Sequence, residues 1–442
     1  CSSGVHYIPH HGVFKEGSDK LRVVYNGSSA TGDDVSLNDC LSPGPSLTNE
    51  LIEMLMRFRT HDVLFSGDIE KAFLQLEVAE ADRDYLRFLW YDQEGNLVVY
   101  RFTRVPFGLR CSSFLLNATL RFHMQQKCME TDNPELLQKL SKSHYVDDWL
   151  VGAKTPEDAI LIKGWLTEFL ESIGMKLHKF NSNSEFVRQN LAVECPENDS
   201  VLGLNWNVTP DEITIKVERA LNKMRKESTK CELYSAPPRI FDPLGFCQPF
   251  IFTAKLLFLE VCKAKIKWKA KLPPDIAEKF DNWKSQIHKL AVISIPRQVV
   301  MPGYDVVELH GFGDASKIGY CACIYIASRS GLLNASNLVV SKTRLAPVKE
   351  MSIPRLELTA AFLLARLMAL VIKFHDQIKF NKMVYYSDST TVLHWVHSNN
   401  HKQWTTYVAN RVRDINLLSS PDSWKYVRTD QNPADLGTRG LE

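Results

Sequence analysis

Acidic residues stand where apolar runs end in the first half of the chain. Asp68 closes an apolar run that starts at Val63, and Asp147 and Asp148 lie between two short apolar arms. A polar break between two apolar arms is typical of a β-hairpin. Phosphoryl transfer can use two divalent ions about 3.5–4 Å apart, and carboxylates from separate strand ends are suited to hold them. Neighbouring side chains of a strand point to opposite faces, so we expect unequal roles for Asp147 and Asp148.

A second set of separated acids occupies the last third of the chain. Pro354 suits a helix start, so the second of these acids is expected in the first turn of a long helix. Four separated acids could also simply be solvated charges. The four are Asp314, Glu357, Asp388 and Asp435.

The composition is that of a globular protein of two to four domains. The chain has 442 residues, of which 45% are hydrophobic and 24% charged. This excludes a disordered tail, a collagen-like fibre and a small disulfide scaffold. The 53 basic and 51 acidic residues give a net charge of only +2, which excludes a polycationic coat but allows a local basic groove. The ten cysteines contain no C-x-x-C pair, and we interpret Cys321 and Cys323 as packing residues in a reducing compartment.

The patterns along the chain predict three segments. Mixed apolar runs and helical periodicity extend from 1 to 232, a basic helical segment from 233 to 303, and a strand-rich segment from 304 to 442. The middle segment contains K-A-K-I-K-W-K-A-K at 263–271, which we expect on a helix that is either solvated or follows a nucleic acid backbone. The apolar stretch 360–374 is too short and too charged to span a membrane and predicts a buried helix.

Ordered motifs in the chain resemble those of known enzymes. F-S-G-D-I-E-K-A-F, V-P-F-G-L-R-C-S-S-F and H-Y-V-D-D-W-L-V-G resemble the palm motifs of reverse transcriptases. Y-I-P-H-H-G-V-F-K, S-L-N-D-C-L-S-P-G-P-S-L, R-F-L-W and R-I-F-D-P-L-G-F are similar to the Pol polyprotein of BEL/Pao long-terminal-repeat retrotransposons. G-D-A-S, P-R-L-E-L, Y-S-D-S and A-D-L-G-T-R-G resemble a ribonuclease H domain.

The resemblance covers essentially the whole chain and implies its fold. Residues 1–232 would form α+β reverse-transcriptase fingers and palm, with the N-terminus of the fingers truncated. Residues 233–303 would form a basic, thumb-like helical connection, and residues 304–442 an α/β ribonuclease H-like domain. The sequence does not begin with Met, which we interpret as the mark of a fragment of a larger product.

The resemblance also implies a role for each polymerase residue. Asp68 and Asp147 would hold two metal ions, with Asp148 assisting and the Ile69 carbonyl as a further ligand. The stretch 201–206 would form a primer grip. The remaining residues would contact substrates: Lys15 and Arg22 the triphosphate, Phe73 the sugar as a gate against a 2′-hydroxyl, Phe107 and Gly108 the nascent base pair, Tyr145 the primer end, and Lys179 the leaving pyrophosphate as a general acid.

Some of these assignments have simpler alternatives. Phe73 could be a core residue, and Lys15 and Arg22 could be solvated surface charges. Asn26 stands where the family more often has Asp, which weakens or alters a contact of the fingers.

The ribonuclease H resemblance implies that Asp314, Glu357, Asp388 and Asp435 also bind two ions, Mg²⁺ or Mn²⁺. Many such domains carry a catalytic His just before the last acid, but W-K-Y-V-R-T-D-Q-N has none, as in many long-terminal-repeat elements. The implied partners are an RNA template, a DNA primer, an RNA–DNA hybrid, dNTPs and other Gag and Pol segments, with no membrane. The implied location is a virus-like particle in the cytoplasm, and the nucleus at a later stage.

The leading hypothesis is therefore an RNA-directed DNA polymerase with ribonuclease H activity. A family label for this region of Pao elements calls it a peptidase, but aspartic peptidases pair two Asp residues, typically from D-[ST]-G loops, and this sequence has no such motif. A third hypothesis is a decayed copy that binds nucleic acid without chemistry. The intact acids argue against decay, whereas the abrupt start suggests that this fragment alone is inactive.

Overall fold

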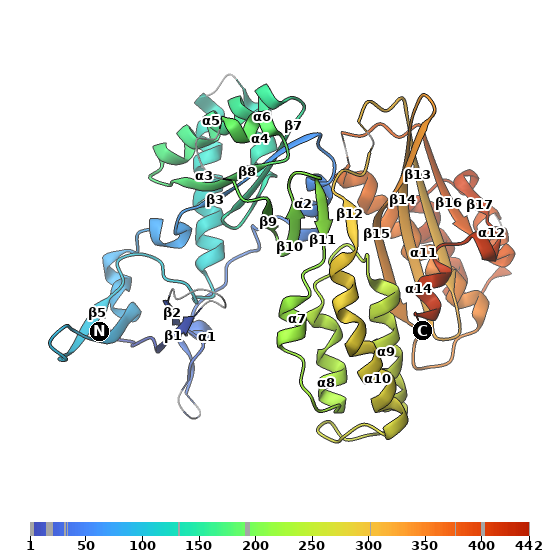
Figure 1. Ribbon diagram of the computed structural model, residues 1–442, viewed down its shortest axis with the longest axis horizontal. Helices are drawn as coiled ribbons and strands as arrows, with labels where there is room; N and C mark the ends of the chain where they lie inside the picture. Colours follow the sequence, from blue (N-terminus) through green and yellow to red (C-terminus); the bar gives the residue numbers. More distant parts are fainter. Residues whose placement is uncertain are drawn as a thin grey trace.

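The computed structural model describes residues 4–14, 21–30, 32, 34–130, 133–190, 195–300, 302–375, 377–398 and 403–441 (Figure 1). Lys15, which the resemblance assigned to the triphosphate, lies outside these residues. Within the described residues, no helix combines the length and the apolarity needed to cross a bilayer.

A four-stranded antiparallel sheet, here named the palm sheet, carries the first set of acids. All residues of its central strand except Asp68 are buried, because both faces of the sheet are covered. Phe65 and Val151 pack toward helices α3 and α5, whereas Leu64 and Leu150 join the larger core that includes helix α2. The strand order is β6-β7-β3-β8, with β3 (Val63–Ile69), β6 (His144–Tyr145), β7 (Asp148–Ala153) and β8 (Leu177–Ser182). The helices are α2 (Leu51–Phe58), α3 (Ser112–Glu130), α4 (Pro134–Ser141), α5 (Pro156–Ser172) and α6 (Glu185–Gln189).

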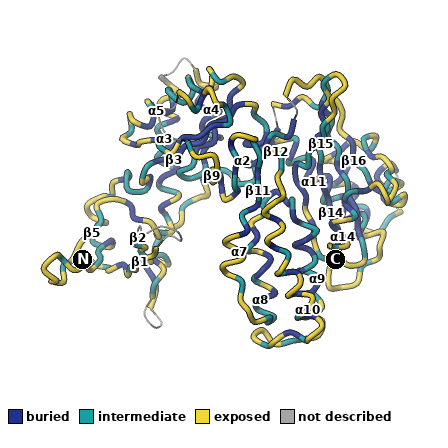
Figure 2. The backbone as a smooth tube through the Cα atoms, viewed as in Figure 1, coloured by how far each residue is buried: buried dark blue, intermediate teal, exposed yellow. Residues whose placement is uncertain are grey.

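Two small ladders form the lobe where the fingers were expected. Aromatic rings join them: the Tyr25 ring meets the edge of Phe88 at 5.3 Å and of Phe102 at 4.8 Å between centroids. Figure 2 shows that this lobe is far more exposed than the palm sheet. Its elements are β1 (His10–Phe14), β2 (Leu21–Tyr25), α1 (Leu37–Cys40), β4 (Arg87–Tyr91) and β5 (Leu97–Arg101).

A second four-stranded sheet and a helical bundle occupy the middle of the molecule. The helices connect two neighbouring strands of this sheet, because in the sequence they follow β11 and precede β12. The strand order is β12-β11-β10-β9, with β9 (Asn198–Val201), β10 (Leu204–Asn207), β11 (Glu212–Thr214) and β12 (Ser294–Pro296). The helices are α7 (Glu218–Asn222), α8 (Lys230–Ser235), α9 (Gln248–Lys263) and α10 (Pro274–Gln286).

The predicted helix over the lysine run is wrong for most of its length. Helix α9 ends at Lys263, and Lys265 has φ 56°, which terminates right-handed helical geometry. Turns then carry the run to Lys271, which bridges to Thr229. The backbone oxygen of Trp268 accepts a hydrogen bond from the Cys231 N–H at 3.0 Å, so these turns are tied to helix α8.

A five-stranded mixed sheet, here named the C-terminal sheet, carries the second set of acids. Its order is β15-β14-β13-β16-β17, with β13 parallel to β16 and β16 parallel to β17. Cys321 and Cys323 are both buried on β14, as predicted for packing residues. The strands are β13 (Val306–Ala315), β14 (Gly319–Ser330), β15 (Leu333–Leu345), β16 (Lys382–Ser387) and β17 (Trp424–Tyr426). The helices are α11 (Ile353–Phe374), α12 (Thr390–His397), α13 (Thr406–Leu418) and α14 (Asp435–Arg439).

A fully buried arginine joins the palm to the C-terminal sheet. Arg59 follows helix α2, and its guanidinium donates to the backbone oxygen of Arg297 at 3.0 Å, near β12, and of Leu338 at 2.8 Å on β15. Arg297 is buried beside it and forms a bidentate ion pair with Asp211 at 2.6 and 2.7 Å. These contacts fix the two acid-bearing sheets relative to each other, because breaking them would leave buried polar groups without partners.

Candidate functional sites

The first site forms where strands β3 and β7 lie side by side. Asp68 and Asp148 are directly paired in the antiparallel register. Side chains of directly opposed residues lie on the same face of a sheet. Asp147 precedes β7 in the hairpin turn, where Val146 has φ 57°, and its backbone oxygen accepts a hydrogen bond from the Ile69 N–H at 3.0 Å. The structure therefore brings together the three acids that the sequence predicted, with Asp148 in register with Asp68.

Burial and mutual repulsion raise the pKa values of two of these acids. Asp148 has its pKa raised to about 8, chiefly by burial and then by the neighbouring Asp68. The pKa of Asp147 is also raised, by burial first and by Asp68 second. A cation placed among the three carboxylates would relieve this repulsion, so the donor set fits a divalent metal ion.

Lys179 forms an ion pair with Asp68, the remaining acid of this site. It has φ 53°, and its Nζ donates to Asp68 Oδ2 at 2.5 Å. The ring of His178 also contacts the backbone oxygen of Asp68, at 2.8 Å through Nδ1. The lysine that the sequence placed beside the leaving pyrophosphate is thus an ion-pair partner of a predicted metal ligand. No local pattern predicted this pairing, since the two residues lie on different strands of the palm sheet.

A cavity of about 330 Å³ opens beside this site. The wall opposite Asp68 and Asp148 is the turn between β9 and β10, with Leu202 at φ 47° and Gly203 at φ 88°. This turn lies within the stretch 201–206 that the resemblance assigned to the primer grip. Ser66 Oγ donates to Asp199 Oδ2 at 3.0 Å and so ties the palm sheet to the β9–β10 hairpin.

The predicted sugar gate packs against a residue assigned to the base pair. Phe73 and Phe107 meet edge to face with centroids 5.1 Å apart, and Phe107 is 50% exposed. Gly108 has φ 93°, and a Cβ added there would lie 2.3 Å from the backbone oxygen of Tyr25. Only glycine fits this approach between the palm and strand β2.

Asn38, to which the sequence analysis gave no role, forms hydrogen bonds beside the contact between Gly108 and strand β2. Its Nδ2 donates to the Gly108 oxygen at 2.9 Å, and its Oδ1 accepts from the Arg110 N–H at 2.8 Å. Its position in S-L-N-D-C-L was part of the resemblance but carried no role. Arg22 is exposed on β2, and Tyr145 is paired with Asp148 in the palm sheet. Their substrate contacts remain predictions.

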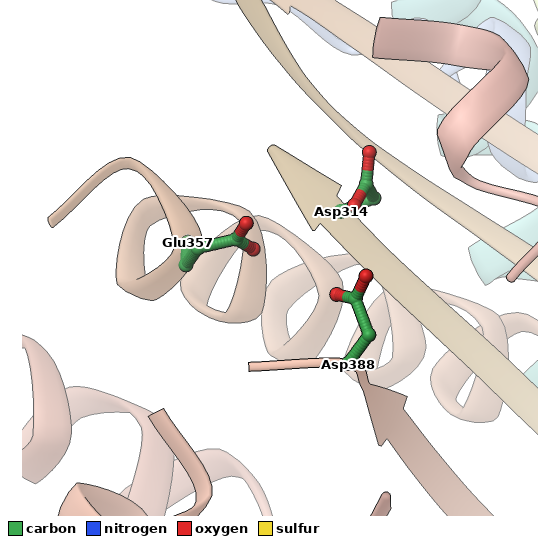
Figure 3. A group of neighbouring side chains, drawn as sticks. All are labelled: Asp314, Glu357 and Asp388. Atoms are coloured by element: carbon green, nitrogen blue, oxygen red, sulfur yellow. The ribbon is translucent and has the colours of Figure 1, made fainter. Parts of the chain in front are cut away.

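The second site forms where two interior strands of the C-terminal sheet, β13 and β16, end side by side. Asp314 lies near the end of β13, Asp388 follows β16 directly, and Glu357 extends from α11 toward both (Figure 3). One carboxylate oxygen from each of the three lies within 4.8 Å of the others. Glu357 is the fifth residue of α11, which begins at Ile353, so the expected position in the first turn is wrong by about one residue.

The chemistry of this cluster also fits a divalent cation. Burial first, and the neighbouring acids second, raise the pKa of Glu357 to about 8. Burial likewise raises the pKa of Asp314 to about 6. Glu357 Oε2 and Asp388 Oδ1 are buried without a hydrogen-bond partner. Buried carboxylate oxygens are rarely left unpaired, and oxygen ligands are those that Mg²⁺ and Mn²⁺ prefer.

The fourth predicted acid stands apart from the other three. Asp435 opens helix α14, and its Oδ1 accepts from Arg439 Nε at 2.8 Å. It is near enough to contribute to the raised pKa of Asp314. Its role as a metal ligand remains a prediction.

Two threonines missed by the sequence reading contact the cluster. Thr438 Oγ1 lies 2.6 Å from Asp314 Oδ2, and Thr429 Oγ1 lies 2.8 Å from Asp388 Oδ2. Thr429 belongs to the stretch that lacks the catalytic His. Isolated threonines carry no spacing signal, so only the tertiary structure shows these contacts.

The two sites therefore lie on two kinds of sheet: an antiparallel palm sheet and a mixed sheet of ribonuclease H type. Two family models match these regions. Residues 32–184 match the reverse transcriptase (RNA-dependent DNA polymerase) family, and residues 229–389 match the Pao retrotransposon-like RNaseH-like domain. Residues 32–184 are thus a reverse transcriptase domain and residues 229–389 a Pao retrotransposon RNaseH-like domain, as the resemblance predicted. The peptidase hypothesis is not favoured, because the matched domain is described as RNaseH-like.

Solved structures show the same fold. The foamy viral protease-reverse transcriptase dRH in complex with double-stranded DNA matches with TM-score 0.61 and 13% identity over 97% of this chain and 66% of that chain. The foamy viral protease-reverse transcriptase in complex with an RNA/DNA hybrid matches with TM-score 0.58 and 14% identity over 100% of this chain and 52% of that chain. The chain thus spans about two thirds or less of the length of these proteins. No curated protein matches the chain in sequence.

Proposed function

We propose that this chain copies RNA into DNA at the palm site and degrades the RNA strand of the resulting hybrid at the C-terminal site. The observation that carries the nuclease half is the convergence of Asp314, Glu357 and Asp388 within 4.8 Å. The polymerase half is supported by the pairing of Asp68 with Asp148 beside the β9–β10 turn.

Each site is proposed to hold two Mg²⁺ or Mn²⁺ ions, which would activate the attacking oxygen and stabilise the leaving one. Asp68, Asp147 and Asp148, with the Ile69 carbonyl, would hold them in the palm. Asp314, Glu357, Asp388 and Asp435 would hold them in the C-terminal site.

The chain's own residues would select and orient the substrates of the polymerase site. The ring of Phe73 would exclude a ribose 2′-hydroxyl from the incoming nucleotide, supported by its contact with Phe107. Lys179 would turn from Asp68 toward the pyrophosphate and donate a proton to the leaving oxygen. The Phe107–Gly108 backbone would lie against the new base pair, with Tyr145 at the primer end. Lys15 and Arg22 would contact the triphosphate.

We further propose that the natural partners are an RNA template, a DNA primer, dNTPs and other segments of the same polyprotein, within a virus-like particle in the cytoplasm and, at a later stage, in the nucleus. Both relatives were solved with nucleic acid, one with double-stranded DNA and one with an RNA/DNA hybrid.

Primer extension on an RNA template and cleavage of an RNA–DNA hybrid test the two activities separately. Asp147→Asn should abolish nucleotide incorporation and spare hybrid cleavage. Glu357→Gln should do the reverse, because each change removes one charged ligand from one site only. Glu278→Gln, on the exposed face of α10, is the matched control and should change neither activity. The two-site proposal fails if Glu357→Gln removes both activities from a folded protein.

A further inference from the structure

The segment 429–441, here named the C-terminal clasp, contacts both sheet-borne acids of the second site. Thr429 Oγ1 donates to Asp388 Oδ2 at 2.8 Å, and Thr438 Oγ1 reaches Asp314 Oδ2 at 2.6 Å. Asn432 Nδ2 donates to the backbone oxygen of Gly313 at 3.1 Å. The clasp therefore binds β13 and the end of β16 at the residues that carry or adjoin the acids.

The hydroxyl of Thr438 has two acceptors within reach. It lies 2.6 Å from Asp314 Oδ2 and 3.0 Å from the backbone oxygen of Asp435. A hydroxyl has one hydrogen, and the charged, nearer acceptor gives the stronger bond. Thr438 is fully buried, and its own backbone oxygen accepts from Ser316 Oγ at 3.0 Å. The orientation of Asp314 is thus set by a side chain that is itself held on both sides.

The far end of the clasp is attached to the middle helical bundle rather than to the C-terminal sheet. The hydroxyl of Thr253, on α9, accepts from the Leu441 N–H at 3.0 Å and donates to the Leu441 oxygen at 2.9 Å. Gly440 has φ 82°, and a Cβ there would lie 2.8 Å from Thr253 Oγ1. Helix α14 packs on α9 on one side and on β14 on the other, so closely that a Cβ at Gly437 would lie 2.3 Å from Cys321 Sγ.

We propose that Thr429 and Thr438 are positioning residues of the nuclease site and that α9, through Thr253, holds them in place. This inference rests on the proposed nuclease function. Each threonine occupies one oxygen of its carboxylate and fixes the other; at Asp388 the remaining oxygen, Oδ1, is the one left buried and unpaired. Groups that orient metal-binding side chains typically change metal affinity by about 10–100-fold. The middle helical bundle would then help to position the nuclease acids, in addition to connecting the palm to the C-terminal sheet.

Threonine-to-valine changes test the positioning role, because valine keeps the shape and removes the hydroxyl. Mn²⁺ binding is measured by calorimetry in a background of Asp68→Asn and Asp147→Asn, which leaves the nuclease site as the metal site under study. Thr438→Val and Thr429→Val should each weaken Mn²⁺ binding about 10–100-fold. Thr438→Ser and Thr429→Ser keep the hydroxyl and should restore it.

Folding is checked by thermal denaturation in EDTA. Thr429 is exposed, so Thr429→Val carries the test if the buried Thr438→Val does not fold. Mn²⁺ binding as tight as in the unchanged chain, in a folded valine variant, overturns the positioning role. If the valine changes weaken Mn²⁺ binding as expected but the unchanged chain cleaves no hybrid, the proposed nuclease function fails while this inference stands.

Thr253→Val tests the anchor on α9. It should speed hydrogen exchange of the Leu441 amide and weaken Mn²⁺ binding, and Thr253→Ser should reverse both effects. Hybrid cleavage should fall while primer extension remains unchanged. Thr167→Val is the matched control: its hydroxyl donates to the Lys163 oxygen one turn earlier on α5, at 2.8 Å. Faster exchange at Leu441 with unchanged Mn²⁺ binding would overturn the role of α9.

Discussion

Asp68 and Asp148 stand directly opposite each other across β3 and β7, and this pairing helps to raise the pKa of Asp148 to about 8. The second site faces the same repulsion between Asp314, Glu357 and Asp388. The two sites relieve it differently. In the palm a cation of the chain, Lys179, pairs with Asp68. In the C-terminal site two hydroxyls take one oxygen each and leave other oxygens unpaired.

The raised pKa of Glu357 predicts how stability depends on pH. An acid whose pKa rises on folding stabilises the folded state below its ordinary value, here 4.5, and this contribution is lost as pH rises through about 8. Glu357→Gln should therefore raise Tm at pH 9 in EDTA, because it removes a buried charge, and the gain should shrink toward pH 5. Differential scanning calorimetry at the two pH values measures this.

Adding metal ions should reduce the Tm advantage of Glu357→Gln over the unchanged chain. Mg²⁺ should raise Tm of the unchanged chain through binding to the folded state, and should raise Tm of Glu357→Gln by less. Glu278→Gln provides the control, with a similar Tm shift at both pH values. If Glu357→Gln has a lower Tm than the unchanged chain at pH 9 in EDTA, Glu357 is not repelled by its neighbours.

Removal of the Lys179 side chain should have opposite effects on metal binding and on catalysis. Its ion pair with Asp68 is partly exposed, with side chains 67% and 23% accessible, and such pairs contribute about 0.2–1 kcal/mol. Lys179→Ala should therefore tighten Mn²⁺ binding at the palm by no more than about fivefold, because the metal no longer competes with the ammonium group.

Nucleotide incorporation by Lys179→Ala should nevertheless fall, since the proposed proton donor is gone. Lys176, which is exposed like Lys179 and lies three residues before it, provides the control through Lys176→Ala. Calorimetry in a Glu357→Gln background and single-turnover primer extension separate the two effects. Weaker Mn²⁺ binding together with normal incorporation would assign Lys179 to structure alone.

The ring contact between Phe73 and Phe107 allows the sugar gate to be separated from packing. Either Phe73→Ala or Phe107→Ala removes the same edge-to-face contact, which contributes about 0.5–1.5 kcal/mol beyond burial. Only Phe73→Ala should raise incorporation of ribonucleotides relative to dNTPs. Primer extension with each nucleotide type measures the ratio. Equal ratios in both variants, with equal losses of Tm, would make Phe73 a core residue.

The sequence predicted the acids at strand ends because local patterns encode them. An apolar run that ends in Asp68, and a polar break at Asp147, are readable from neighbouring residues alone. The lysine run was misread because charge does not fix backbone geometry: Lys265 adopts φ 56° and ends the helix. Glu357 was displaced by about one residue because α11 already begins at Ile353, one residue before Pro354.

Contacts between distant segments could not be predicted in the same way. Thr253 and Leu441 are 188 residues apart, and their mutual hydrogen bonds have no local signal. Lys179 and Asp68 are 111 residues apart, and their pairing follows from the order of strands in the palm sheet. The sequence therefore predicted which acids could hold a metal, but not which side chains orient or neutralise them.

Gly108 predicts how the fingers depend on the palm. A Cβ there would lie 2.3 Å from the Tyr25 backbone oxygen, and φ is 93°. Gly95, in the β4–β5 turn, has a similar φ of 83° but nothing within 4 Å of an added Cβ. Both substitutions by alanine share the left-handed strain of about 1–2 kcal/mol. Only Gly108→Ala must also move strand β2.

Gly108→Ala should therefore lower Tm further than Gly95→Ala and raise KM for dNTPs, because β2 carries Arg22 and Gly108 itself is proposed to lie against the new base pair. Hybrid cleavage should stay unchanged in both variants, since the C-terminal site does not touch this junction. Steady-state primer extension and calorimetry on the two variants give the comparison. If the two alanine variants share the same Tm and the same KM, the close approach at Tyr25 does not position the fingers.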